Sequence, residues 1–300
     1  IVDALIERKH EVVVVDNMST GKKENLNMKA EFFHEDITNL DIIKPFFNGV
    51  DYVFHLAAQA RMQPSIFNPR KTFQDNVIGT LNVLLASKDA KVKKVIYSAS
   101  SSAYGAQKKM PLHEGMETGP KNPYALSKIM GEQICRLFSG LYGLKTVSLR
   151  YFNVYGPRQP KEGIYATVIG IFLRQKYNRE PLTIVGDGQQ KRDFTYISDI
   201  VKANLLAMES SAGNGEIINI GTGKNDSINS IAGMVLETNI KDACGNRLVN
   251  YIPKRPEEVE ETLADISLAN KLLGWKPSIS MKEGLQKTAA WHEQKISRKN

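Results

Sequence analysis

Short apolar runs alternate with helical patterns along the first half of this 300-residue chain, and this alternation limits the folds that it can adopt. The predicted strands lie at 12–15, 31–34, 51–56, 93–100 and 145–150, and the predicted helices lie at 1–10, 76–87 and 123–142. Strands that alternate with helices form a parallel sheet covered by helices on both faces. We therefore predict an α/β fold with a doubly wound parallel sheet, in which the four valines at 12–15 form a buried strand.

The pattern changes after Asn153, where glycines and prolines separate shorter elements. We predict a first domain at 1–153 and a smaller α/β domain at 154–300, with residues 194–221 returning to the first sheet. A chain of this length can bury the core of one large domain or two smaller ones.

Composition excludes several classes of protein. No apolar stretch approaches the roughly 20 residues that a membrane-spanning helix needs. The formal net charge is +8, but the lysines and arginines are dispersed, which is not typical of a nucleic-acid-binding surface. Cys135 and Cys244 have neither metal-ligand spacing nor the pattern of a disulfide framework. We expect a cytoplasmic protein without a metal site that binds neither membranes nor nucleic acids.

The run at 93–105 ends in polar side chains. Its apolar residues are followed by Ser100, Ser101 and Ser102 and then by Gly105. In open α/β sheets, ligands bind in the crevice at the carboxyl ends of the strands. A serine hydroxyl here can hydrogen-bond to a ligand oxygen, although a single serine is as well explained as a turn residue.

Tyr124 and Lys128 lie four residues apart, after a proline that suits the first turn of a helix. This spacing places the phenol and the ammonium on one helical face. A nearby positive charge lowers the pKa of a phenol, which is ordinarily about 10. Such pairs arise often by chance, but this one follows Ser100 by 24 residues. Together the three residues predict a catalytic site with Tyr124 as proton acceptor.

With these motifs the chain resembles the extended short-chain dehydrogenase/reductase family, specifically its nucleotide-sugar epimerases and dehydratases. The resemblance covers essentially the whole chain. Its segments are Asp16-Asn17, Asp36-Ile37, His55 to Ala58, Asn76 to Thr80, the serine run, Tyr124 with Lys128, Leu149 to Arg158, Arg192 to Asp199 and Arg255 to Val259. It implies that 1–153 is a Rossmann-like NAD-binding domain and that 154–300 is a substrate domain.

The resemblance also implies where NAD binds. Asp16 would hydrogen-bond to the adenosine ribose, and its carboxylate would repel a 2′-phosphate, which favours NAD over NADP. The other positions that the family places around the dinucleotide are Asn17, Asp36, Ile37, Leu56, Ala57, Ala58, Asn76, Tyr124, Lys128 and Tyr151. Dinucleotide folds begin with a strand and a glycine-rich turn, which we do not find in this chain. We expect roughly 15 to 20 further residues before Ile1 in the intact protein.

For the substrate, the resemblance implies a UDP-sugar. Arginine offers forked donors that suit a pyrophosphate. In the family, the positions of Asn153, Arg192 and Arg255 grip the diphosphate, and that of Glu258 contacts the nucleotide ribose. Ser100, Ser101 and Ser102 would border the sugar.

The serine run also bears on the reaction. Similar dehydratases carry an acidic pair after the strand-end hydroxyl, and UDP-glucuronate decarboxylases carry a glutamate. Ser101 and Ser102 titrate too high for that chemistry, so elimination is disfavoured. We predict NAD-dependent 4-epimerisation of a UDP-hexose through a transient 4-keto intermediate. Tyr124 would take the proton of the 4-hydroxyl, Ser100 would hydrogen-bond to that oxygen, and Lys128 would lower the pKa of the phenol.

Thr262 bears on substrate width. The alignment places it at a pocket wall, where a tyrosine restricts related epimerases to unacetylated sugars. A small residue leaves room for an N-acetyl group, which favours UDP-GlcNAc/UDP-GalNAc interconversion, alone or together with UDP-Glc/UDP-Gal. The alternative is an exposed loop threonine. A homodimer packed through the helices at 76–87 and 123–142 is implied by the resemblance alone.

Two other functions remain open. One is a different nucleotide-sugar enzyme of this fold, namely a UDP-glucuronate decarboxylase, a dehydratase or a reductase. The other is a non-catalytic NAD-binding regulatory protein, against which the retained Ser100, Tyr124 and Lys128 argue.

Overall fold

The computed structural model describes residues 1–160, 163, 166–254 and 259–297. Its strands are β1 Val13–Val15, β2 Glu31–Phe33, β3 Tyr52–His55, β4 Lys94–Ser100, β5 Thr146–Tyr151, β6 Val154–Tyr155, β7 Leu182–Val185, β8 Lys191–Arg192, β9 Thr195–Tyr196, β10 Asn214–Ile220, β11 Asp226–Ser227 and β12 Val249–Ile252. Its α-helices are α1 Val2–Glu7, α2 Leu40–Ile43, α3 Met62–Phe67, α4 Pro69–Phe73, α5 Gly79–Asp89, α6 Pro123–Tyr142, α7 Val168–Tyr177, α8 Ile197–Glu209, α9 Ile228–Leu236, α10 Ile240–Gly245, α11 Ser267–Leu273 and α12 Met281–Ser297. Shorter helical turns are η1 Lys23–Asn25, η2 Lys44–Phe47, η3 Gln74–Ile78 and η4 Ser101–Tyr104.

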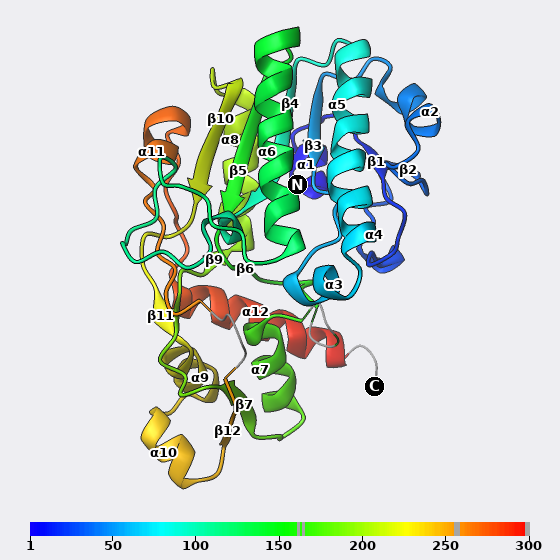
Figure 1. The fold of residues 1–300 in the computed structure, drawn as a ribbon. Helices are drawn as coiled ribbons and strands as arrows, with labels where there is room; N and C mark the ends of the chain where they lie inside the picture. The colour runs from blue at the N-terminus through cyan, green and yellow to red at the C-terminus, as the bar shows by residue number, and fades with distance from the viewer. Residues whose placement is uncertain (161–162, 164–165, 255–258, 298–300) are drawn as a thin grey trace.

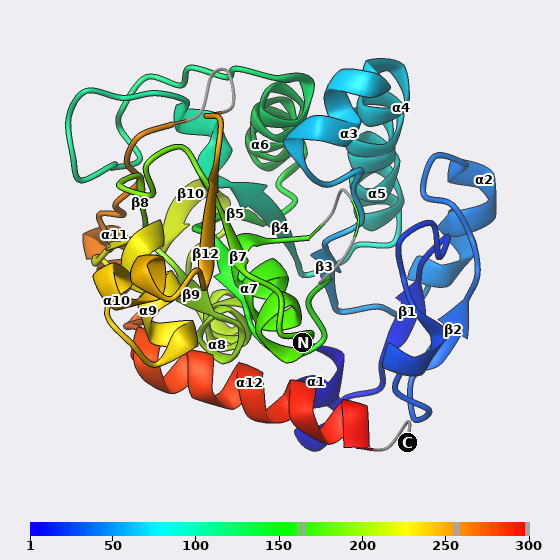
Figure 2. The same ribbon diagram turned by 90° about the horizontal axis from the view of Figure 1, so that it is seen from below.

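A four-stranded parallel sheet forms the centre of the larger lobe (Figure 1). Its strand order is β10-β5-β4-β3, and every neighbouring pair is parallel. Helices α5 and α6 cover one face, and α8 and α1 cover the other (Figure 2). The predicted α/β fold, with helices on both faces of a parallel sheet, is confirmed.

The apolar residues of β4 are explained by burial on both faces of the strand. Val95 and Tyr97 pack into the core beneath α5 and α6, and Ile96 packs into the opposite core with residues of α8. A strand in a parallel sheet is buried on both faces, so both sets of side chains must be apolar or satisfied. The polar residues therefore gather where the strand ends.

Strand β1 departs from the prediction of a buried strand. It pairs in parallel with β2, and the two form a separate sheet that is not hydrogen-bonded to the four-stranded one. One face is consequently open, and Val13 is 41% exposed.

Helix α6 has the bounds that the pattern predicts. The Asn122 side chain accepts a hydrogen bond from the N–H of Ala125 at its start, and Gly143 takes a left-handed φ of 67° at its end. Tyr124 therefore lies in the first turn. The helix predicted at 76–87 differs, because it begins as a π-helical turn and becomes regular at Gly79.

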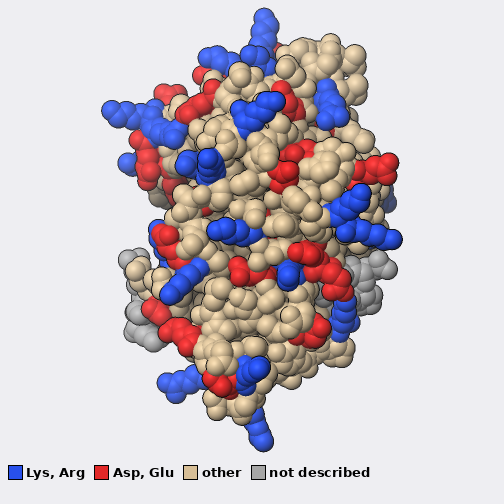
Figure 3. Space-filling view, turned by 90° about the vertical axis from the view of Figure 1, so that its left-hand side faces the viewer, with Lys and Arg blue, Asp and Glu red and all other residues tan. Residues whose placement is uncertain are grey.

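The smaller lobe contains α7, α9, α10 and the parallel pair β7–β12, and α12 crosses the view of Figure 1 between the two lobes. Strand β10 belongs to the other lobe, where it pairs with β5. The chain therefore crosses between the lobes more than once. On the face seen in Figure 3, acidic and basic side chains are intermixed over both lobes. None of the helices that the structure describes is both long and apolar enough to cross a bilayer.

Candidate active site

The polar ends of β4 and α6 meet at the edge of the sheet that faces the smaller lobe (Figure 1). Ser100 is the last residue of β4, and its hydroxyl is near enough to the phenol of Tyr124 to act on the pKa of that phenol. Ser100 Oγ also accepts hydrogen bonds from the N–H and the hydroxyl of Ser102, at 3.2 and 2.9 Å. With its lone pairs engaged, Ser100 can donate its own proton to the tyrosine oxygen.

Lys128 is buried one helical turn below Tyr124. Its Nζ donates to the carbonyl of Ser98 at 2.7 Å and lies 6.0 Å from the centroid of the Tyr124 ring. Burial lowers the pKa of Lys128 to about 8.

The lowering of the phenol pKa by Lys128 stays a prediction. Burial raises the pKa of Tyr124 above its ordinary value, and the opposing influences are the Ser100 hydroxyl and the positive charge of Arg61. The Lys128 ammonium is directed to the Ser98 carbonyl rather than to the phenol oxygen. Desolvation favours the neutral form of a buried phenol, so proton transfer by Tyr124 depends on the groups that stabilise its charge.

The residues expected to hold NAD lie along the same sheet edge. Asn76 clamps the segment after β3: its side chain accepts from the N–H of Gln59 and donates to the carbonyl of that residue and to Ser127 Oγ. Leu56, directly after β3, is 51% exposed, and Ala57 is exposed beside it. Exposed apolar side chains at a strand end fit the flat underside of a dinucleotide.

At the other end of this surface, β1 and β2 are joined through their loops. Asn17 Nδ2 donates to Asp36 at 2.8 Å, and the N–H of Thr38 donates to the same carboxyl group at 2.9 Å. These bonds lower the pKa of Asp36 against an opposing effect of burial. Asp16 is exposed and accepts a hydrogen bond from the N–H of Met18. Ile37 packs closely against Gly79, because a Cβ added to Gly79 would lie only 2.5 Å from Ile37 Cδ1.

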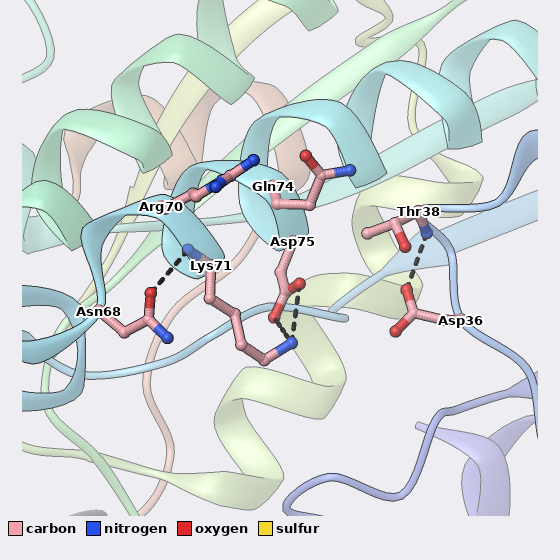
Figure 4. A pocket seen from close by; sticks show the side chains of 7 residues that line it. All are labelled: Asp36, Thr38, Asn68, Arg70, Lys71, Gln74 and Asp75. Carbon is pink, nitrogen blue, oxygen red and sulfur yellow. Dashed lines mark hydrogen bonds and ion pairs between the residues drawn. The ribbon is translucent and has the colours of Figure 1, made fainter.

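A pocket of about 410 Å³ opens beside Asp36 (Figure 4). Helix α4 supplies its opposite wall, where Lys71 pairs with Asp75. Figure 4 shows the Lys71–Asp75 pair and the Asp36–Thr38 hydrogen bond on facing walls. The pocket includes Asp36, one of the residues expected to hold NAD, and it is lined by donors and acceptors.

Tyr151 is held below the site. Its hydroxyl donates to Asn204 at 3.0 Å and lies 3.1 Å from Ser98 Oγ, and burial raises its pKa to about 12. A neutral phenol that makes two hydrogen bonds supports this edge of the sheet and is not suited to accept a proton.

The predicted substrate residues are partly brought together. Asn153, with a φ of 29°, donates from Nδ2 to the carbonyl of Asp193 at 2.8 Å and to Thr262 Oγ1 at 3.4 Å. Thr262 is half-buried, not an exposed loop residue. Arg192 donates to the carbonyls of Lys191 and Glu260. Arg255 and Glu258 lie outside the described residues. Ser101 begins η4, beside the two other serines.

Asp193 is a residue that the sequence did not single out, although it stands in the Arg-Asp-Phe run. Its buried carboxylate accepts from the N–H and hydroxyl of Thr222 and from the N–H groups of Gly223 and Ala264. One side chain therefore ties together three chain segments at the cleft. Burial raises its pKa, and these hydrogen bonds oppose the rise.

No three His, Cys, Asp or Glu side chains gather as metal ligands would in the part of the chain that the structure describes. The side chains that meet at the end of β4 are a phenol, hydroxyls and an ammonium.

Comparison with known proteins agrees with this arrangement. The sequence model of the NAD dependent epimerase/dehydratase family matches residues 1–221. The chain belongs to this family. It is 39% identical over 307 residues to the UDP-glucuronate 4-epimerase of Thermodesulfobacterium geofontis, covering 97% of this chain and 91% of that one.

Two solved structures of the family are similar throughout. One is the UDP-glucose 4-epimerase of Thermotoga maritima with UDP-glucose, at a TM-score of 0.92 and 39% identity, covering 98% of this chain and 94% of that one. The other is the UDP-N-acetylglucosamine 4-epimerase of Methanobrevibacter ruminantium with UDP-N-acetylmuramic acid, at 0.90 and 38%, with the same coverage. The family's cofactor is NAD, and the exposed apolar end of β3 and the carboxylates of the β1 and β2 loops fit it.

Proposed function

We propose that this epimerase-family protein catalyses the NAD-dependent 4-epimerisation of a UDP-hexose. The observation that carries the proposal is the placement of Ser100 at the end of β4 beside Tyr124 in the first turn of α6, with Lys128 one turn below. The similarity to three UDP-sugar 4-epimerases supports it.

Tyr124, Ser100 and Lys128 have separate roles in the proposed reaction. Tyr124 takes the proton of the sugar 4-hydroxyl in its ionised form and returns it later in the cycle. Ser100 hydrogen-bonds to the C4 oxygen of the sugar and stabilises the charge on that oxygen as it becomes a carbonyl. Bound NAD supplies the hydride acceptor and donor. Lys128 anchors the first turns of α6 to β4, and its ammonium is proposed to hold the cofactor ribose.

Asn153 and Arg192 are proposed to hold the diphosphate. Asn153 is fixed by Asp193 and Thr262, so its position in the cleft is set before substrate binds. Arg192 lies on β8, which pairs with β11 in the smaller lobe. Donors on both lobes can then keep the nucleotide in place while the 4-keto sugar turns between the two hydride transfers.

Product analysis tests the reaction. The protein is incubated with NAD and, separately, UDP-GlcNAc, UDP-glucose and UDP-glucuronate, and products are identified by chromatography and mass. Epimerisation conserves mass, whereas a decarboxylase loses carbon dioxide, a dehydratase loses water and a reductase adds hydrogen. A product of altered mass, or no conversion with any of the three, would contradict the proposal.

Thr262 is proposed to set the width of the sugar pocket. Thr262→Tyr is expected to lower kcat/KM for UDP-GlcNAc by about tenfold or more relative to UDP-glucose, because the larger ring would occupy space needed by the acetamido group. The matched control is Thr262→Val, which removes the hydrogen bonds to Asn153 and Asp193 and keeps the volume. Equal losses on both sugars in Thr262→Tyr would argue against a role in selection.

The remaining proposals concern assembly and location. Leu137, Leu141 and Tyr142 are more than half exposed on α6, and an apolar helix face of this kind suits a homodimer. Light scattering should then give twice the chain mass of 33.5 kDa. Both cysteines are free thiols, which is typical of the reducing cytoplasm.

A further inference from the structure

Asn219 uses both polar atoms of its side chain in hydrogen bonds to other parts of the protein. It lies on β10, in register with Arg150 of β5, and is fully buried. Its Oδ1 accepts a hydrogen bond from the hydroxyl of Tyr104 at 2.7 Å, and its Nδ2 donates to the carbonyls of Leu112 and Asp265 at 2.9 and 3.4 Å. A buried amide whose oxygen and nitrogen both have partners fixes the groups around it in one geometry.

The first of these hydrogen bonds holds the turn that carries the serine run at 100–102. Tyr104 is the last residue of η4, which begins directly after β4. Its ring is fully buried and packs on the guanidinium of Arg150, and burial raises the pKa of Tyr104, so that its hydroxyl stays protonated as the donor. Within the same turn, the Ser102 hydroxyl donates to Ser100 Oγ. Asn219 therefore holds the end of the turn from which the serine hydroxyls project.

The other two hydrogen bonds hold the segment 262–265, whose first residue is the threonine proposed to set the width of the sugar pocket. Leu112 pairs with this segment: its N–H donates to the carbonyl of Leu263 at 2.7 Å, and its carbonyl accepts from the N–H of Asp265 at 2.9 Å. Asn219 donates to the same Leu112 carbonyl and to the carbonyl of Asp265, so one amide joins both members of the pair.

We propose that Asn219 is a positioning residue that sets the separation between two walls of the sugar pocket, the serine run at 100–102 and the segment 262–265. This inference rests on the proposed function, in which both walls border the sugar. Asn219 acts through its neighbours and not on the sugar, because its side-chain atoms are engaged with protein. Its hydrogen bonds keep Ser100 aligned with the C4 oxygen, where a hydrogen bond that strengthens in the transition state raises kcat.

Tyr104→Phe removes one of the three hydrogen bonds and keeps the ring against Arg150. We expect kcat, for whichever UDP-hexose is epimerised, to fall about tenfold, because a small displacement of a group that aligns the reacting atoms is costly. The Kd values of NAD and UDP, measured by calorimetric titration, should change less than about twofold, because the loss is confined to the transition state. The matched control is Tyr177→Phe, which removes a tyrosine hydroxyl bonded to Ala289 and Glu293 and should leave kcat unchanged.

Hydrogen exchange tests the link between the two walls without turnover. In Tyr104→Phe the N–H groups of Leu112 and Asp265 should exchange about tenfold faster, although the substitution lies in another segment of the chain. Mass spectrometry of the peptides that carry them measures this, and Tyr177→Phe should leave both rates unchanged. Asn219→Ala should raise both rates further. Adding Tyr104→Phe to it should then have little more effect, because the shared hydrogen bond is already gone.

Unchanged exchange at Leu112 and Asp265 in Tyr104→Phe would overturn the proposal, since the two walls would then be fixed independently. A lower melting temperature with an unchanged kcat would also overturn it, because Tyr104 and Asn219 would then support the fold alone. If the unmodified protein epimerised no sugar, the proposed function would fail, while the exchange rates would still decide whether Asn219 couples the two segments.

Discussion

Replacement of Tyr124 by phenylalanine is expected to lower kcat by about 10²- to 10⁴-fold, the range that a positioned general base contributes. The ring stays in place, so the start of α6 should keep its packing. The neighbouring Ser100 hydroxyl keeps its hydrogen bonds with Ser102. Binding of NAD and of UDP should therefore be retained, and calorimetric titration of each checks this.

Tyr142→Phe is the matched control. It removes a phenol hydroxyl from the last turn of the same helix, where the side chain is exposed and far along the chain from the cleft. Its kcat should equal that of the unmodified protein. If Tyr124→Phe retained more than about a tenth of the activity, another group would have to accept the proton, since loss of a general base costs more than that.

The second large effect concerns stability. Glu132 on α6 and Arg150 on β5 form a bidentate pair at 2.8 and 2.7 Å, and their side chains are 2% and 3% exposed. The guanidinium also lies 4.6 Å from the centroid of the Tyr104 ring. Removing one partner of a buried pair leaves an uncompensated charge, so Glu132→Gln is expected to lower the free energy of unfolding by about 3–5 kcal/mol.

Urea denaturation measures this loss, and a double-mutant cycle with Arg150→Met separates the pair from the sites around it. The double variant should be more stable than Glu132→Gln alone, because no charge is then left without a partner. A single-variant loss below about 1 kcal/mol, the value of an exposed pair, would contradict a tightly coupled buried interaction.

Local sequence patterns predicted the elements that are determined by local chemistry. Helix α6 has the predicted bounds, because a capping asparagine, a proline and a terminal glycine fix its ends. The ends of β4 and β5 followed from apolar runs that must be buried on both faces. The prediction was wrong for β1, because burial of a strand depends on its neighbours in the sheet and not on its own four valines.

Within the site, motif spacing predicted that Ser100, Tyr124 and Lys128 lie at one edge of the sheet. An i, i+4 spacing places two side chains on one face but does not say where the lysine's ammonium ends, and here it meets the Ser98 carbonyl. Asp193 was missed because the partners of its carboxylate, Thr222 with Gly223 and Ala264, come from two other segments of the chain.

The Asp193 carboxylate has a consequence for how this cleft can diversify. Since it anchors the backbone at Thr222, Gly223 and Ala264 simultaneously, the wall that they build follows a fixed path whichever side chains project from it. Single amino-acid substitutions at positions next to this wall can then change which sugar is preferred. They do so without altering the path of a loop or the residues around Tyr124.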